Sequence, residues 1–280
     1  YFPRSFAETY SIFNNILLND IVKKQNNQKK EIYILDIGSG TGGNLAGLLI
    51  SLIKSLPEKI NINIIAIDGN KDALKILERI ISKIQINYNI NICLSCHYVT
   101  FDTVTDLHEN SKQFFEPNFD FIISSKMINE IISKDKNSYF NYYKHFAKYL
   151  NDHGLLLMLD VTTKIEPHTF MPILLNLQTM KFIQENEGVY RTLLPTICSE
   201  YDYTCKQECF SNNHFTVNHS QKSMDKSKIT YKVIGKKDFV LDILKELKEK
   251  GNVIGWDKNG SEKNCGLISF KSNKQSAYKI

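Results

Sequence analysis

The sequence of 280 residues contains no long apolar run, and this limits the kinds of protein it can encode. A helix that crosses a bilayer needs about 18 or more consecutive apolar residues, and no stretch approaches that length. A secretory signal, an internal repeat and a long low-complexity tract are also missing. These absences argue against a membrane-spanning or repeat protein. Because 42% of the residues are hydrophobic, we expect a packed core.

Glycine is scarce as well, with 13 residues, yet four glycines fall in the segment Leu35-Asp-Ile-Gly-Ser-Gly-Thr-Gly-Gly43. A β-rich apolar run precedes this segment and a helical pattern follows it, so the sequence predicts strand, glycine loop and helix. Glycines there let the backbone turn tightly and approach a ligand without interference from a Cβ atom. Asp36 stands at the carboxyl end of the strand, where an anion suits a cationic or hydroxyl-bearing ligand better than a pyrophosphate.

Two cofactor classes compete for this loop. Gly38, Gly40 and Gly43 satisfy G-x-G-x-x-G, the dinucleotide fingerprint, but a single match of that kind is weak. With Asp36 in front, the segment reads D-x-G-x-G and resembles motif I of the class I methyltransferases that use S-adenosylmethionine (SAM). The resemblance implies that the loop contacts the amino-acid moiety of SAM. A glycine-rich turn without a ligand is the third alternative.

A second buried strand is predicted at 62–68 and ends in Asp68, after which Gly69 and Asn70 open an amphipathic helix. A carboxylate in this position can accept hydrogen bonds from both ribose hydroxyls. Dinucleotide enzymes carry an acid in a similar place, and an Asp can also cap a helix. Asp68 therefore indicates a nucleoside without choosing between the cofactors.

Further strands alternate with helical patterns along the chain. Continuous apolar runs imply strands that are covered on both faces, and the alternation indicates a doubly wound α/β fold. We expect a mostly parallel, seven-stranded sheet of the Rossmann-like type found in class I methyltransferases. The remaining strands are predicted at 90–101, 119–125, 154–160, 188–197 and 229–235.

The first 25 residues read as a single helix that packs on the sheet, with Ser5 and Glu8 as a capping box. In many methyltransferases such a helix covers the SAM pocket, which makes Arg4 and Tyr10 weak candidates for contacts. The predicted organisation is a helical cap at 1–30, a methyltransferase core at 31–237 with a Cys-containing insertion at 198–228, and a basic extension at 238–280.

The predicted cofactor site gathers residues that follow the carboxyl ends of the strands, where ligands of α/β sheets bind. Asp102 follows the third strand, which the methyltransferase resemblance places near the adenine. Ser124 lies near the end of the fourth strand, where the motif IV of that family faces the transferable methyl. The candidate residues are Asp36, Gly38, Ser39, Gly40, Gly42, Asp68, Gly69, Asn70, Asp102 and Ser124.

The residues after the fourth strand bear on the chemistry. Lys126 and Glu130 are either substrate contacts or ordinary first-turn helix charges. The region lacks Asn/Asp-Pro-Pro-aromatic, which argues against the common methyltransferases of exocyclic nucleobase amines. It also lacks Pro-Cys, which argues against the cysteine-nucleophile cytosine type. No residue is assigned as catalytic, because transfer from a sulfonium mainly requires proximity and orientation.

Cysteine provides two separate signals. Cys93 and Cys96 fall in the predicted third strand, where residues three apart point to opposite faces, so we expect buried thiols rather than a shared metal. The insertion carries three more cysteines, and clustered cysteines in an intracellular enzyme indicate zinc or an iron–sulfur cluster. Their C-x6-C-x3-C spacing matches no standard finger, and free thiols remain the alternative. The candidate metal ligands are Cys198, Cys205, Cys209 and Cys265.

The charge distribution is uneven. Residues 221–280 hold 14 Lys against 7 acids, a net charge of +7, whereas residues 1–220 hold 21 basic residues against 23 acids, a net charge of −2. A basic C-terminal segment suggests a polyanionic partner such as RNA. Lysines scattered over so many positions are equally consistent with a solvated surface.

The order of features also resembles the methyltransferase-like proteins associated with the small subunit of mitochondrial ribosomes, and their bacterial relatives. Tyr1, Arg4 and Tyr10 match the start of that family, and Asn129-Glu130 matches its motif after the fourth strand. The resemblance implies an iron–sulfur cluster on the four candidate cysteines and binding to ribosomal RNA in the mitochondrial matrix or the bacterial cytoplasm. The chain departs from the family where Cys198 precedes Ser-Glu in place of Pro-His.

Three functions are compatible with these patterns. The first is a SAM-dependent methyltransferase that acts on small-subunit ribosomal RNA. The second is a SAM-dependent methyltransferase of a small molecule. The third is a non-catalytic ribosome-assembly protein that retains the SAM fold.

Overall fold

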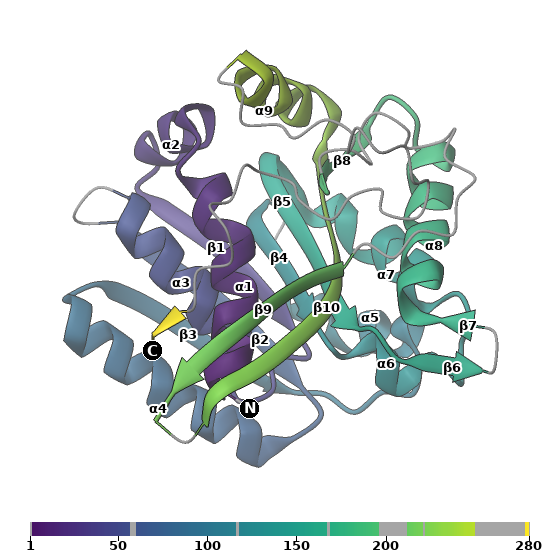
Figure 1. The fold of residues 1–280 in the computed structure, drawn as a ribbon, viewed down its shortest axis with the longest axis horizontal. Coiled ribbons are helices and arrows are strands. Elements are labelled where there is room, and N and C mark those ends of the chain that lie inside the picture. Colours follow the sequence, from purple (N-terminus) through teal and green to yellow (C-terminus); the bar gives the residue numbers. More distant parts are fainter. Residues whose placement is uncertain are drawn as a thin grey trace.

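The computed structural model describes residues 2–56, 60–115, 118–166, 169–195, 212–220, 222–249 and 278–279. Within these residues a sheet of nine strands forms the centre, with helices on both faces (Figure 1). Its strands are β1 (Glu31–Ile37), β2 (Asn61–Asp68), β3 (Asn91–Tyr98), β4 (Phe119–Ser125), β5 (Leu150–Val161), β8 (Tyr190–Leu194), β9 (Asn212–His219), β10 (Lys222–Lys236) and β11 (Tyr278–Lys279). A separate pair consists of β6 (Lys164–Glu166) and β7 (Thr169–Phe170).

The strand order confirms the predicted fold class. The sheet runs β3-β2-β1-β4-β5-β10, and β8 pairs with β10, which gives the expected seven strands. Neighbouring strands from β3 to β5 are parallel, whereas β10 runs antiparallel to β5. Two strands come in addition: β9 pairs with the first part of β10, and β11 pairs with β9. The polar segment predicted as an insertion therefore contributes to the sheet itself.

Helices cover the sheet in two layers. The described helices are α1 (Phe2–Leu17), α2 (Asp20–Asn27), α3 (Gly43–Ser55), α4 (Lys71–Tyr88), α5 (Val104–Ser111), α6 (Ile128–Ile131), α7 (Ser138–Phe146), α8 (Met171–Glu185) and α9 (Lys237–Glu249), with single 3-10 turns η1 (Lys112–Phe114) and η2 (Ala147–Tyr149). One core cluster joins the sheet to α1, α3 and α4, and the other joins it to α5, α7 and α8. All seven residues of β4 are buried, as a strand covered on both faces requires.

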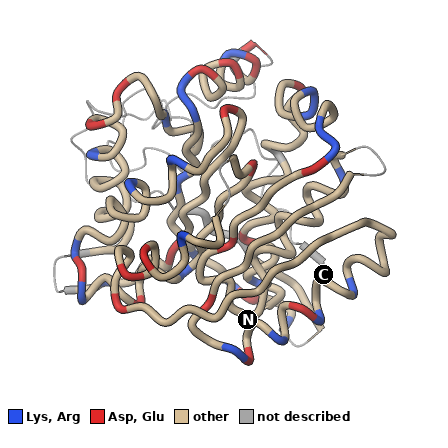
Figure 2. The backbone as a smooth tube through the Cα atoms, turned by 180° about the vertical axis from the view of Figure 1, so that it is seen from behind, with Lys and Arg blue, Asp and Glu red and all other residues tan. Residues whose placement is uncertain are grey.

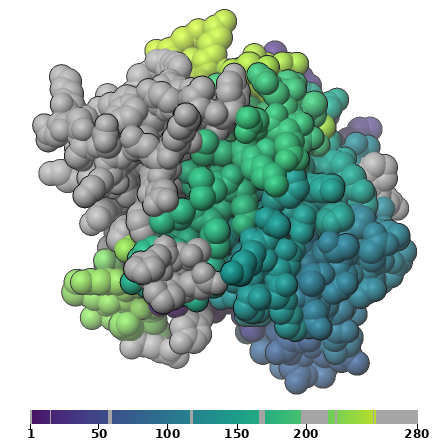
Figure 3. Space-filling view, turned by 90° about the vertical axis from the view of Figure 1, so that its right-hand side faces the viewer, coloured from purple at the N-terminus to yellow at the C-terminus, as the bar shows by residue number. Residues whose placement is uncertain are grey.

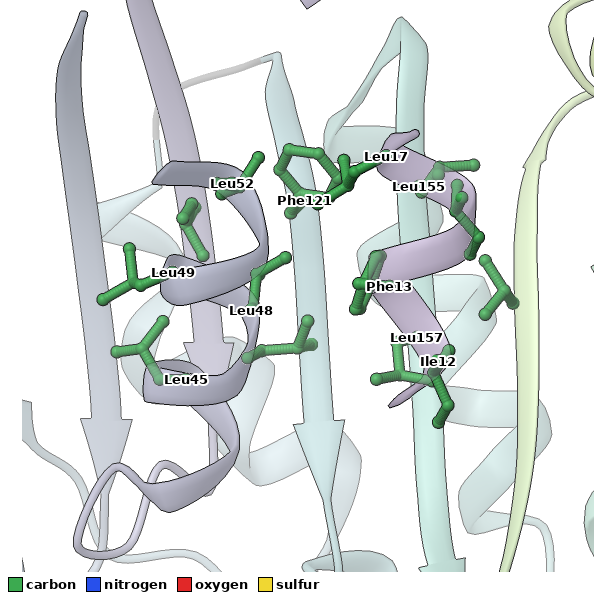
Figure 4. Close-up of a cluster of buried hydrophobic side chains, with 14 of the residues drawn as sticks. Ile12, Phe13, Leu17, Leu45, Leu48, Leu49, Leu52, Phe121, Leu155 and Leu157 are labelled. Atoms are coloured by element: carbon green, nitrogen blue, oxygen red, sulfur yellow. The ribbon is translucent and has the colours of Figure 1, made fainter. Parts of the chain in front are cut away.

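Helix α1 packs directly on α3, and two glycines of α3 make the contact close (Figure 4). A Cβ atom on Gly47 would overlap the carbonyl oxygen of Phe6, and one on Gly43 would lie 2.9 Å from the Cβ of Ser5. Phe13 packs edge-on against Phe121 of β4, with ring centroids 5.7 Å apart. The N-terminal end of α1 thereby lies at the carboxyl edge of the sheet, where the arrowheads of Figure 4 point.

The N-terminal prediction was wrong in two respects. Two helices replace the single one, because the side chain of Asn19 accepts hydrogen bonds from the N–H groups of Ile21 and Val22 and starts α2. Ser5 and Glu8 form no capping box, since α1 already contains both residues. Glu8 is instead fully buried and serves the site described below.

The prediction of buried thiols was also wrong for Cys93, which is exposed. Strand β3 is an edge strand of the sheet, so the face that carries Cys93 is not fully covered. Cys96 is half-buried against the α3 and α4 side, and burial raises the pKa of its thiol to about 11.

The surface on the β5 side is formed by the teal and green segments that include α7 and α8 (Figure 3). They lie between the blue segment at α4 and the yellow-green α9.

None of the helices in the described part of the chain is long and apolar enough to cross a membrane.

Candidate functional site

The glycine loop between β1 and α3 adopts a backbone that favours glycine at three positions. Gly38, Gly40 and Gly42 have φ of +70°, +52° and +80°, values that L side chains rarely adopt. A Cβ on Gly42 would overlap Leu77, and one on Gly38 would lie 2.5 Å from the Cβ of Met127. Gly40 differs, because no atom lies within 4 Å of an added Cβ. The loop is thus closely packed at both ends and open at its middle.

Asp68 connects this loop to the end of β2. One carboxylate oxygen accepts a hydrogen bond from the N–H of Gly40 at 2.7 Å, and the other accepts one from the N–H of Asn70 at 2.8 Å. The side chain of Asn70 in turn caps α4 by accepting from the N–H groups of Asp72 and Ala73. Gly69 lies between these two polar residues. The predicted residues after β1 and β2 therefore form one hydrogen-bonded unit.

Asp36 contributes a buried negative group beneath the loop. Its side chain is 1% exposed, and one carboxylate oxygen has no hydrogen-bond partner. Burial, followed by repulsion from Asp68, raises the pKa of Asp36 well above its ordinary value. Burial and Asp68 likewise raise the pKa of Glu130. A cationic ligand would relieve both costs, and SAM carries a sulfonium and an ammonium group. The buried hydroxyl of Ser39 is a further polar atom here without a partner.

The two remaining predicted residues lie in different surroundings. Ser124 is fully buried at the end of β4, beside Tyr142 of α7. Asp102 is exposed after β3 and pairs with Lys134. The structure therefore brings Asp36, the glycines, Asp68 and Asn70 together, and it leaves Asp102 at the surface. The part that each plays in cofactor binding remains a prediction.

The turn at residues 126–130 follows β4 and packs against the glycine loop through Met127. Lys126 has φ of +59°, and its N–H donates to the carbonyl of Leu159 at 2.8 Å. Its ammonium group donates to a carboxylate oxygen of Glu8 at 2.5 Å. The other oxygen of Glu8 accepts from the hydroxyl of Ser227 at 2.7 Å. Glu8 therefore joins α1, the turn and β10, and its buried carboxylate pairs with the half-buried Lys126.

Asp160, at the end of β5, holds the same turn from the opposite side. Its carboxylate accepts hydrogen bonds from the N–H of Asn129 at 3.1 Å, the hydroxyl of Tyr139 at 2.9 Å and the N–H of Val161 at 2.7 Å. With the amide of Asn129 turned so that its nitrogen faces Asp160, the side chain donates as well, at 3.1 Å. Burial raises the pKa of Asp160 to about 7, and these hydrogen bonds oppose the rise.

Glu8 and Asp160 were not among the predicted site residues. A signal for Asp160 was present, because it ends the fifth buried strand just as Asp68 ends the second. Glu8 carried no such signal, since its partners Lys126 and Ser227 lie far away in the sequence.

The predicted metal ligands Cys198, Cys205, Cys209 and Cys265 lie outside the described residues. Among the residues that the structure does describe, no group of three or more His, Cys, Asp or Glu side chains could hold a metal ion. The cluster hypothesis thus stays a prediction from the sequence.

An acid-led glycine loop at the carboxyl end of β1, in a sheet of this order, defines a SAM-dependent methyltransferase. Residues 13–191 match a family model described as O-methyltransferase, and the chain belongs to that family. The matched segment spans α1 to β8 and so includes the loop, Asp68, the turn and Asp160. No curated protein matches the chain in sequence.

Solved methyltransferases are similar at low identity. The plantazolicin methyltransferase BpumL in complex with SAH is 12% identical, with 82% of this chain and 87% of that chain covered and a TM-score of 0.44. The StiE O-MT segment is 12% identical, with 86% and 79% covered and a TM-score of 0.39. A candidate rRNA methylase from Clostridium thermocellum is 8% identical, with 76% and 92% covered and a TM-score of 0.40.

Proposed function

We propose that this methyltransferase transfers the methyl group of SAM to a hydroxyl oxygen of a small molecule. The observation that carries the proposal is the match to the O-methyltransferase family over residues 13–191. Figure 2 shows basic and acidic residues interspersed along the described backbone, as seen from that side.

The site residues fit the cofactor and the reaction. SAM supplies an activated methyl group, which an acceptor oxygen attacks in line; the new O–C bond forms as the S–C bond breaks. The open space at Gly40 lets the cofactor approach the backbone of the loop. The carboxylate of Asp36 can interact with a sulfonium or an ammonium group. The carboxylate of Asp68 can accept hydrogen bonds from ribose hydroxyls. A hydroxyl acceptor must also lose its proton.

Ribosomal RNA remains the alternative that the sequence suggested. Five of the 14 lysines in the basic segment 221–280 fall among residues 250–277, outside the described part of the chain. The experiment therefore offers both classes of acceptor to the same enzyme.

The test uses the full chain with SAM that carries a radiolabelled methyl group. Acceptors are a panel of phenols, catechols and hydroxy acids, and separately small-subunit ribosomal RNA. We expect label in an organic-extractable product that mass spectrometry identifies as a methyl ether. Label found only in RNA would contradict the proposal and restore the ribosomal function.

A matched pair of variants links the activity to the site. Asp68→Asn removes the charge that binds Gly40 and Asn70, and we expect SAM affinity to fall at least tenfold, a change of about 1.4 kcal/mol. Asp72→Asn removes the same charge from an exposed side chain in the first turn of α4, and we expect no change. Calorimetric titration with SAM measures both. Equal affinities would show that the cofactor does not use Asp68.

A further inference from the structure

The turn at residues 126–130 interacts with the glycine loop, with the acid after β2 and with the N-terminal helix. Met127 packs against Gly38 so closely that no Cβ fits there. Glu130 lies near enough to Asp68 for their charges to interact. Lys126 is paired with Glu8 of α1. A shift of this turn would therefore disturb the glycine loop, the acid after β2 and the N-terminal helix at once.

The turn has little local structure to hold it in place. Helix α6 is only four residues long, and Lys126 has a left-handed backbone that is unfavourable for a lysine. Met127 and Ile128 pack in the core, and Asp160 adds a polar restraint, because its carboxylate binds the N–H of Asn129. The preceding residue, Leu159, accepts from the N–H of Lys126. Strand β5 thus fixes the turn at two backbone groups.

We infer that Asp160 is a positioning residue for methyl transfer, whose ionised carboxylate fixes the 126–130 turn and through it the SAM-binding loop. The inference concerns cofactor binding by the known class of enzyme and does not depend on the proposed acceptor. Protonation would replace an acceptor with a donor on one oxygen and weaken the hold on Asn129. Asp160 therefore makes the position of the turn depend on pH.

The surroundings of Asp160 determine when it ionises. Burial raises its pKa to about 7, while the Tyr139 hydroxyl from α7 and the positive charge of Lys126 from the turn lower it. Thr230, which lies beside Asp160 on the neighbouring strand β10, carries no charge. Met171 of α8 contacts the same Tyr139 hydroxyl and is also neutral. Tyr139 is thus the group through which the pKa can be changed without touching the turn.

The experiment measures SAM affinity by calorimetry between pH 5.5 and 8.5 for the wild type and for Asp160→Asn. The amide resembles the protonated acid at every pH. We expect the wild type to bind SAM about tenfold more tightly than Asp160→Asn does at pH 8.5, and equally tightly at pH 5.5. The ratio of the two affinities cancels the titration of the amino group of SAM, which is common to both measurements. A ratio that is constant across the range would overturn the inference.

Tyr139→Phe provides a second test that holds even if Asp160→Asn does not fold. It removes one hydrogen bond that favours the ionised carboxylate, so the pH at which affinity is half-maximal should move upward relative to the wild type. A purely structural role would weaken binding without moving this midpoint. The midpoint would also stay in place if Asp36 were the titrating group, because the hydroxyl of Tyr139 donates to Asp160. An unmoved midpoint therefore contradicts the inference.

Discussion

The two halves of the site are built by different means. The cofactor half, from Asp36 to Gly43 and on to Asp68, consists of backbone conformations and N–H groups within a short stretch of chain. The other half, the turn at 126–130, is held by buried carboxylates from α1 and β5 and by a hydroxyl from β10. The first half depends on steric fit, whereas the second depends on charge. The two should therefore fail in different ways when altered.

The largest effect is expected for Gly42→Ala. The new methyl group would overlap Leu77 in a backbone already at φ +80°, so we expect a loss of about 4 kcal/mol in unfolding free energy. Gly40→Ala is the matched control, because it meets no atom within 4 Å and should cost only about 1 kcal/mol.

SAM binding sharpens this contrast. Gly40→Ala should abolish SAM binding although the protein remains folded, because its methyl group would occupy the open face of the loop. Urea denaturation and calorimetry measure the two quantities. Full affinity in Gly40→Ala would mean that the cofactor does not approach the loop there.

The second effect concerns the buried pair of Glu8 and Lys126. Glu8→Gln keeps the shape and the partner Ser227 but leaves the ammonium group of Lys126 unpaired, and we expect a loss of about 3 kcal/mol. Lys126→Met removes the ammonium group but leaves the Glu8 carboxylate with the Ser227 hydroxyl and with Arg4 at 3.9 Å, so it should cost less. The double variant should be more stable than the sum of the two losses predicts. Strict additivity in urea denaturation would argue against the pair.

The smallest effect is a pH dependence of stability. The pKa of Asp160 is raised from 3.8 to about 7, so the folded protein binds a proton that the unfolded chain has released. The contribution of Asp160 to the free energy of unfolding is therefore fully present below about pH 4, and it is lost as the pH rises through about 7. Relative to Asp160→Asn, we expect the wild type to lose about 2.7 kcal/mol between pH 5 and 8.5. Thermal unfolding at both pH values checks the sign, and a gain would contradict it.

The comparison also explains what the sequence could predict. The loop, Asp68 and Asn70 are neighbours in the chain or end successive strands, so period and motif are enough to find them. Glu8 could not be found in this way, because the hydrogen bond to Ser227 spans 219 positions. The break at Asn19 was missed for a local reason, since the apolar stripe continues through a change of helix axis. The extra strand β9 lies in a polar segment without an apolar pattern, and it is a strand because it pairs with β10.

The long reach of Glu8 has a consequence for the order in which the molecule assembles. Contacts between distant positions carry a larger cost of loop closure and form later than local ones. While the chain leaves the ribosome, the parallel strands β1, β2 and β4 and their glycine loop can come together before β10 has been synthesised. Only the arrival of Ser227 completes the hold on Glu8. A nascent chain would thus form the glycine loop before it can hold the turn at 126–130 in place.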